Sequence, residues 1–126
     1  MIILSKKQVI SLHSSLVKQF GGLHGVRDDK LLNSALQTPF QTFEGEDLYP
    51  TVHKKAACLC FGLINNHAFH DGNKRIGILT MMTFMELNGI EIFCTNEELI
   101  ELGFSIASGK TGQEQILNWI IAHDSI

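Results

Sequence analysis

Two long stretches of apolar residues, separated by one short polar segment, most constrain the fold of this chain. The first, Ala56–Ile64, reads AACLCFGLI, and the second, Ile76–Met85, is largely apolar as well. A helix that is apolar on every side is typical of a domain interior, whereas a surface helix has one polar face. We therefore predict two buried helices, one from Thr51 to about Asn66 and one from Asn73 to Asn88, joined through His67–Asp71.

Further helices are predicted around this pair from capping residues and apolar spacing. Three capping-box patterns mark helix starts: Ser5-x-x-Gln8, Thr95-x-x-Glu98 and Thr111-x-x-Glu114. Asp28 is placed to cap another helix, which must end near Thr38 because Pro39 follows it. The last two helices are expected at Asn96–Ala107 and Gly112–His123. With 126 residues, the chain fits one domain, and we predict a single all-α domain over residues 1–126, a compact bundle of about six helices.

The segment between Pro39 and Pro50 is the one stretch that is not predicted to be helical. Its β-prone residues stand beside a glycine, in the order Phe40-Gln41-Thr42-Phe43-Glu44-Gly45. We expect a short β-hairpin there, which forms a flap before the central helix.

Charge and cysteine content exclude several classes of protein. Lys and Arg number 10 against 13 Asp and Glu, for a net charge of −3, whereas a general nucleic-acid binder is usually basic. Cys58-x-Cys60 lacks the second pair that zinc needs, and Cys94 is far away in sequence, so reduced thiols in small buried positions are expected. No secretory signal is recognised, and both apolar stretches are too short to span a bilayer. We therefore expect a soluble cytoplasmic protein.

The polar segment between the two apolar helices concentrates the chemistry of the chain. Residues 67–75 read HAFHDGNKR, with two imidazoles, a carboxylate, an amide and two cations. Polar groups between buried helices cost stability unless they serve a purpose. Gly72 permits a tight turn, and the helix that starts after it offers unpaired N–H groups to an anion. Because Asn73, Lys74 and Arg75 add donors and charge, this loop is predicted to bind phosphates.

Phosphate chemistry suggests roles for the other loop residues. A divalent cation usually accompanies a polyphosphate, and Asp71 is the loop's only carboxylate that can hold Mg²⁺. His67 is then left to accept the proton of a hydroxyl that attacks phosphorus. We expect Phe69 to anchor the loop to the core and give His70 no catalytic role.

The same residues carry a family resemblance. The segment His67-x-Phe69-x-Asp71-Gly72-Asn73-Lys74-Arg75 resembles the Fic/Doc signature, His-x-Phe-x-(Asp/Glu)-Gly-Asn-(Gly/Lys)-Arg, at every fixed position. The segments 21–25, 43–50 and 88–89 are also similar to short Doc-type proteins, so the resemblance covers nearly the whole chain. It implies the Fic fold and the transfer of part of ATP, with Mg²⁺, to a hydroxyl of a target protein.

The resemblance also implies a role for each matched residue. These roles are a base (His67), a Mg²⁺ ligand (Asp71) and a phosphate site (Gly72, Asn73, Lys74 and Arg75). Lys74 stands where most of the family has glycine. This is similar to the death-on-curing (Doc) toxins, which transfer the γ-phosphate to elongation factor Tu. The resemblance therefore implies the toxin of a toxin–antitoxin system, a protein Ser/Thr kinase that inhibits translation.

Two protein partners follow from the same resemblance. The hairpin residues Thr42, Phe43, Glu44 and Gly45 are expected to dock an extended segment of the target, a translation factor, by strand addition. The nearest match to the family's inhibitory Ser/Thr-x-x-x-Glu-Gly/Asn helix, Thr42-x-x-x-Glu46-Asp47, fails at its last position. Inhibition is therefore expected from a cognate antitoxin in trans, as for Doc, and no direct contact with nucleic acid or membrane is expected.

Other interpretations stay open. AMP transfer, as in most Fic proteins, is the main alternative to γ-phosphoryl transfer. Binding of a nucleotide or partner without turnover, and metal-dependent hydrolysis of a phosphate, are the others. His67-x-x-His70-Asp71 lacks a further metal ligand, and Ser108-Gly109-Lys110-Thr111 lacks the strand and glycine spacing of a P-loop. The remaining polar residues expected at the surface are Lys54, Lys55, His13, His24, His53 and His123.

Overall fold

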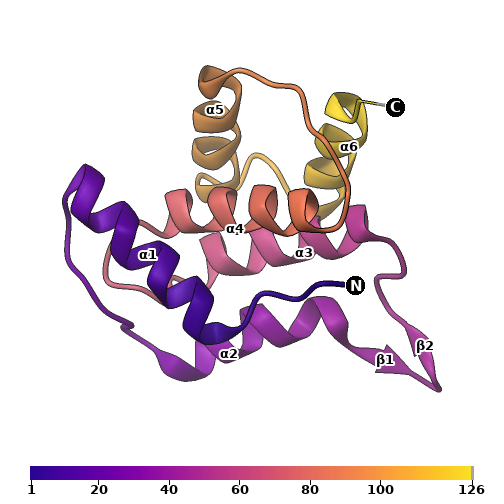
Figure 1. The fold of residues 1–126 in the computed structure, drawn as a ribbon, viewed down its shortest axis with the longest axis horizontal. Helices are drawn as coiled ribbons and strands as arrows, with labels where there is room; N and C mark the ends of the chain where they lie inside the picture. The colour runs from indigo at the N-terminus through magenta and orange to yellow at the C-terminus, as the bar shows by residue number, and fades with distance from the viewer. Residues whose placement is uncertain (126) are drawn as a thin grey trace.

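The computed structural model describes residues 1–125 and holds six α-helices and one β-hairpin in that range. The helices are α1 (Lys6–Phe20), α2 (Asp29–Gln37), α3 (Val52–Asn65), α4 (Asn73–Leu87), α5 (Asn96–Ala107) and α6 (Gln113–His123), with a 3₁₀ turn at Thr38–Phe40. This confirms the predicted all-α bundle with a hairpin before the central helix (Figure 1). No helix of the described part is both long and apolar enough to cross a lipid bilayer.

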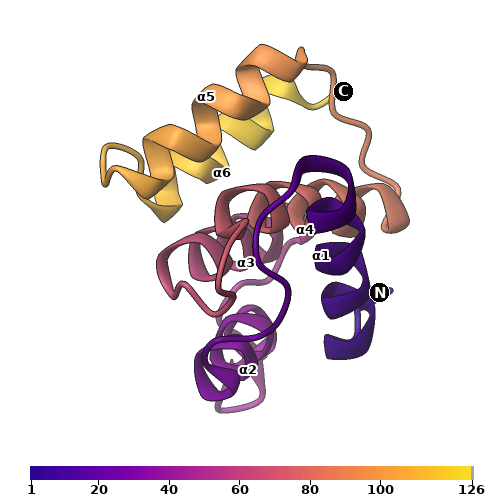
Figure 2. The same cartoon turned by 90° about the vertical axis from the view of Figure 1, so that its left-hand side faces the viewer.

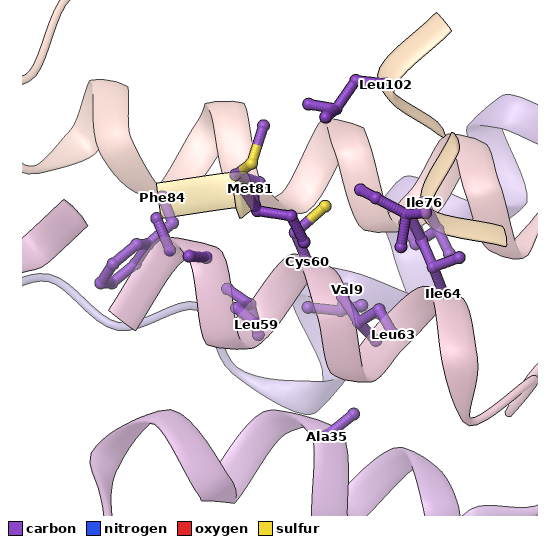
Figure 3. Close-up of a cluster of buried hydrophobic side chains, with 14 of the residues drawn as sticks. Val9, Ala35, Leu59, Cys60, Leu63, Ile64, Ile76, Met81, Phe84 and Leu102 are labelled. Atoms are coloured by element: carbon purple, nitrogen blue, oxygen red, sulfur yellow. The ribbon is translucent and has the colours of Figure 1, made fainter. Parts of the chain in front are cut away.

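The two apolar helices, α3 and α4, lie antiparallel through the middle of the molecule (Figure 1). Side chains of both helices interdigitate in the core, as Figure 3 shows for Leu63 and Ile64 of α3 beside Ile76 of α4. The helices approach closely at Gly77, where a β-carbon would lie only 2.5 Å from Cγ1 of Ile64. A larger residue at position 77 would therefore push α3 and α4 apart.

The other four helices cover this central pair from two sides. In Figure 2, α5 and α6 lie above α3 and α4, whereas α1 and α2 lie beside and below them. Small residues again allow close approach, since a β-carbon at Gly62 of α3 would lie 3.3 Å from that of Ala35 in α2. The core thus lies around two central helices, which the four amphipathic helices cover.

Most of the predicted helix starts are confirmed. The capping boxes Ser5–Gln8 and Thr95–Glu98 are both present. Asp28 caps α2, with its Oδ1 accepting from the N–H of Leu31 at 3.0 Å. These starts depend on residues three positions apart, which is why the local sequence predicts them.

The capping box predicted at Thr111 and Glu114 is wrong. Helix α6 is capped at Gly112, whose N–H donates to the side chain of Gln115, one residue later than predicted. The hydroxyl of Thr111 instead pairs with that of Ser105 at the end of α5. The local pattern favours Thr111, but the contact with Ser105, which the pattern does not include, engages the Thr111 hydroxyl.

The hairpin pairs β1 (Thr42–Phe43) with β2 (Glu46–Asp47) in antiparallel register, Phe43 opposite Glu46. Positive φ angles at Glu44 (50°) and Gly45 (81°) form the turn, as in the type I′ turns that suit the twist of a hairpin. The hairpin was predicted at Phe40–Gly45, but Phe40 belongs to the 3₁₀ turn, and the second strand extends to Asp47.

The three cysteines are free thiols, as predicted, and two of them are buried in α3. Burial raises the pKa of the Cys58 and Cys60 thiols above the usual range, which keeps them protonated. They therefore act as small apolar residues of the core.

The adjacent residues Lys54 and Lys55 lie in different environments, although both were expected at the surface. Lys54 is exposed, but Lys55 is only 3% exposed. Its Nζ donates to Oδ2 of Asp47 at 3.1 Å and to the carbonyl oxygen of Tyr49. The prediction was wrong for Lys55 because successive helical residues differ by about 100° around the axis, and Lys55 faces the base of the hairpin.

Replacing Lys55 by alanine is expected to lower the free energy of unfolding by about 1–3 kcal/mol, because the variant loses two hydrogen bonds at a buried site. Lys54→Ala is the matched control, and its effect is expected to stay within about 0.5 kcal/mol. Urea unfolding followed by circular dichroism measures both. Equal stabilities of the two variants would contradict a role for Lys55 in tying the hairpin to α3.

A second unpredicted contact joins α5 to α6 through His123. Its Nδ1 lies 2.7 Å from the Trp119 carbonyl oxygen, and its Nε2 lies 2.7 Å from Oε2 of Glu98. His53 similarly pairs with Asp124 at 2.6 Å. The expected surface position without partners is therefore wrong for both histidines, although His24 is exposed as predicted.

The His123–Glu98 contact shifts the pKa of both groups. The hydrogen bond to Trp119, followed by the Glu98 carboxylate, raises the pKa of His123 above 6.5. The backbone hydrogen bond at Thr95, followed by His123, lowers the pKa of Glu98 below 4.5. A raised histidine pKa stabilises the fold below 6.5, and this stability is lost as the pH rises through the raised value. A lowered glutamate pKa stabilises the fold at pH values above 4.5. The contact is therefore strongest between pH 4.5 and pH 6.5.

The variant His123→Gln cannot take up the proton and is expected to lose this pH-dependent part of the stability. The difference in Tm between the wild-type protein and the variant should therefore narrow as the pH is raised from about 6 to about 8. Thermal unfolding across this range measures it, with His24→Gln as the control at an exposed histidine. A Tm difference that stays constant with pH would mean that folding does not raise the pKa of His123.

Candidate functional site

The polar loop at residues 66–72 lies where α3 ends and α4 begins, at one end of the central helix pair (Figure 1). The segment at residues 21–28, which connects α1 to α2, runs beside it. Val26 and Phe69 form an antiparallel bridge, and the N–H of His70 donates to the carbonyl of Gly25 at 3.2 Å. Backbone hydrogen bonds to a segment distant in sequence thus fix the shape of this loop.

The side chain of Asn73, in the first turn of α4, forms two hydrogen bonds with the backbone of Phe69. The N–H of Phe69 donates to Oδ1 of Asn73 at 3.1 Å, and Nδ2 of Asn73 donates to the carbonyl of Phe69 at 3.0 Å. Phe69 itself is 1% exposed and lies in the core. Both polar groups of the Asn73 side chain are therefore engaged by the loop backbone, which gives this residue a positioning role.

His13 of α1 braces the same loop, although it was expected at the surface. It is 2% exposed, and its ring stacks on Phe69 with 3.9 Å between centroids. Its Nε2 lies 2.6 Å from the carbonyl oxygen of Asp71, so Nε2 carries the proton in this bond. A signal existed in the sequence, because His13 lies four residues from both Val9 and Val17, the two buried apolar residues of α1.

Asp71 keeps its carboxylate at the surface of the loop. Oδ2 accepts from the N–H of Leu23 at 2.8 Å, which ties Asp71 to the segment at residues 21–28. The alternative role of Asp71 as the cap of α4 is not observed, because Gly72 occupies the N-cap position. An exposed carboxylate beside a helix start fits Mg²⁺, which proteins commonly hold with one or two carboxylates and with phosphate oxygens of a substrate.

A metal site made of protein groups alone is not found among residues 1–125, since no three His, Cys, Asp or Glu side chains gather there. His67, His70 and Asp71 therefore do not form such a site. Any cation at Asp71 would depend on oxygen atoms from a ligand.

The first turn of α4 is open to an anion. Gly72 has φ 74°, a left-handed conformation that glycine adopts without strain, and α4 begins directly after it. Within residues 1–125, the backbone N–H groups of residues 73–75 donate no hydrogen bond. Free N–H groups and the positive end of the helix dipole together favour negative charge at this point.

Two exposed cations flank this helix start. Nζ of Lys74 lies 5.0 Å from the centre of the Phe104 ring on α5, and Cζ of Arg75 lies 4.4 Å from the centre of the Phe20 ring on α1. Aromatic faces attract cations and restrict their positions. The first turn of α4 thus carries two cations, one directed toward α5 and the other toward α1.

His67 is exposed and has φ 49°, which is uncommon for a residue with a β-carbon. It shares the loop and first helical turn with Phe69, Asp71 and the predicted phosphate-binding residues 72–75. The sequence-predicted site residues of this segment therefore lie together.

The hairpin lies elsewhere. It precedes α3, whereas the loop follows α3, so the two lie at opposite ends of this helix (Figure 1). The 14 residues of α3 correspond to a length of about 21 Å. Residues Thr42 to Gly45 are therefore not part of the loop site, and their docking role stays a prediction.

The chain is similar to known proteins. The Fic/DOC family matches residues 3–85. The chain is 44% identical over 73 residues to "Toxin Doc" of Mycolicibacterium smegmatis, a match that covers 58% of this chain and 56% of that protein. It is 26% identical over 110 residues to "Protein kinase doc" of Escherichia phage P1, covering 85% of this chain and 83% of the phage protein. The chain thus spans little more than half the length of the mycobacterial relative.

The variant His13→Ala is expected to lower the free energy of unfolding by about 2 kcal/mol or more, because it removes a buried ring contact and leaves the Asp71 carbonyl without its donor. His24→Ala, at an exposed histidine, is the matched control and is expected to change stability by less than about 0.5 kcal/mol. Urea unfolding measures the difference, and hydrogen exchange shows whether the amides of residues 67–72 lose protection first. If both variants unfolded at the same urea concentration, the contacts of His13 would make no contribution to the stability of the protein.

Proposed function

This chain belongs to the Fic/DOC family, and on that premise we propose that it is an ATP- and Mg²⁺-dependent transferase that modifies a hydroxyl group of a target protein. One observation carries the proposal: a single loop joins an exposed histidine, an exposed carboxylate and a helix start with free N–H groups. Groups for proton transfer, metal binding and phosphate binding are thereby close together in the chain.

The phosphates of ATP would bind at the first turn of α4. The free N–H groups of residues 73–75 donate to phosphate oxygens, and the guanidinium of Arg75 can donate two parallel hydrogen bonds. Lys74 adds a point charge beside it. Asp71 would hold Mg²⁺ with its remaining carboxylate oxygen, and the cation would neutralise part of the phosphate charge.

His67 would act as the general base. Its imidazole accepts the proton of the target hydroxyl while the hydroxyl oxygen forms a bond to the γ-phosphorus. The bond between that phosphorus and the oxygen bridging to the β-phosphate breaks, and ADP leaves with the electron pair. A histidine suits this step because a neutral imidazole has a ring nitrogen that can accept a proton.

Transfer of the γ-phosphate is preferred to transfer of AMP for two reasons. Lys74 places a long charged side chain in the first turn of α4, where most of the family has glycine. In addition, the phage relative matched over 85% of this chain is named a protein kinase. Adenylylation is the second candidate, because the family as a whole supports it.

The biological role proposed here is that of the toxin in a toxin–antitoxin system. The similarity to the mycobacterial protein named a toxin supports it. We propose a translation factor similar to elongation factor Tu as the target, so that modification inhibits translation, and a cognate antitoxin as the inhibitor in trans.

ATP labelled separately at the α and γ positions tests the proposal, in reactions that contain Mg²⁺ and purified elongation factor Tu or a cell extract. We expect a protein band that retains the γ label and excludes the α label. The variant His67→Ala is expected to reduce the rate of transfer by about 10²–10⁴-fold. The control is His70→Ala, at the other exposed histidine of the loop, which should retain most of the wild-type rate.

The other outcomes of this experiment are equally informative. A band that retains only the α label would establish adenylylation and contradict the kinase. Tight ATP binding with neither label transferred would favour a binding module, and released phosphate without a protein acceptor would favour a hydrolase. Undiminished transfer by His67→Ala would remove His67 from the mechanism.

A further inference from the structure

Arg27 joins the segment at residues 21–28 to the end of α3. Its Nε donates to the carbonyl of His67 at 2.7 Å, and its Nη2 donates to the carbonyl of Asn66 at 3.3 Å. Its backbone N–H also donates to the carbonyl of Ala68 at 2.7 Å. One arginine therefore binds three consecutive carbonyl groups of the loop.

These carbonyls lie at a point where the backbone is strained. Helix α3 is capped by Asn66, and His67 follows it with φ 49°. A left-handed residue directly after a helix cap is common, but it is usually glycine, because a β-carbon disfavours this conformation. The residue proposed as the base thus holds a conformation that its own side chain opposes.

The Arg27 side chain is suited to hold this conformation. Carbonyl groups at a helix C-terminus lack intrahelical donors and carry partial negative charge, which a cation compensates. The planar guanidinium presents several donors in a fixed geometry, so it reaches two adjacent carbonyls at once, whereas an ammonium is a single point charge. In the described part of the chain, no other group donates to the carbonyls of Asn66 and His67.

We infer that Arg27 is a positioning residue, which fixes the left-handed backbone of His67 through the carbonyls of residues 66 and 67 and thereby orients the His67 imidazole. The backbone bonds at Val26, Gly25 and Ala68 hold the later part of the loop. Among residues 1–125, only the Arg27 side chain forms a hydrogen bond with the residue proposed as the base. This inference rests on the proposed function, because it concerns the orientation of that base.

The variants Arg27→Ala and Arg27→Lys test this role in the full chain, with Lys30→Ala as the control at a nearby exposed cation. Arg27→Ala is expected to lower kcat for labelled transfer by at least about tenfold, with the KM for ATP unchanged within about twofold, since the phosphate site at residues 72–75 is intact. Arg27→Lys should recover only part of kcat, because it restores the charge without the planar fork. Lys30→Ala should match the wild-type protein.

Backbone NMR relaxation at His67 provides a readout that does not need activity. Arg27→Ala is expected to increase the mobility of the His67 amide. The chemical-shift dispersion of the core amides should remain that of the wild-type protein, which shows that the variant is folded. Unchanged kcat in Arg27→Ala, or unchanged mobility of the His67 amide, would overturn the inference.

If Arg27→Ala does not fold, Arg27→Lys decides, and wild-type kcat in that variant would count against positioning by the planar fork. Failure of the proposed function is distinguishable, because the wild-type protein would then transfer no label, while the NMR comparison would still test the role of Arg27.

Discussion

The close antiparallel packing of α3 and α4 is the constraint on which the rest of the structure depends. Gly77 and Ile64 bring the two helices together so tightly that no β-carbon fits at position 77. Both helices are buried, so neither can shift without opening the core. The short loop between them is therefore confined to a narrow range of conformations. This packing fixes the two ends of the loop, and the contacts from residues 21–28, His13 and Asn73 fix its course between them.

At this site, the loop is held mainly by side chains other than those proposed to take part in the reaction. Two of the groups that hold the loop, His13 and Asn73, are buried, and their side chains form hydrogen bonds with the loop backbone. The groups proposed to react are exposed, as for His67 and Asp71. Because buried polar atoms with partners are costly to displace, the scaffold of the loop is rigid. The exposed groups stay available to a ligand.

The sequence predicted features that depend on neighbouring residues and missed those that depend on tertiary contacts. The two buried helices and the caps at Ser5 and Asp28 follow from local spacing, and the structure confirms them. The burial of His13 had a local signal in its spacing from Val9 and Val17. Lys55 had none, because only the hairpin decides that this face of α3 is covered.

In the candidate site too, the sequence predicted what is local and missed what depends on tertiary contacts. Residues 67–75 are contiguous, so the sequence was sufficient to place them together. Arg27 lies 40 residues from His67 in the chain, and a single sequence contains no information that joins them. The hairpin was expected to serve the site, yet its position at the far end of α3 depends on the direction in which that helix runs.

The unpaired N–H groups at the start of α4 have a thermodynamic consequence. Helix α4 contributes Ile76, Met81, Phe84 and Met85 to the core, so an anion bound at its first turn completes the hydrogen bonding of an element that the fold needs. Binding and folding are then linked, and a ligand at one hundred times its Kd adds about 2.7 kcal/mol to the free energy of unfolding. Through this link, the resistance of the protein to heat and proteolysis would vary with the concentration of the anion that binds there.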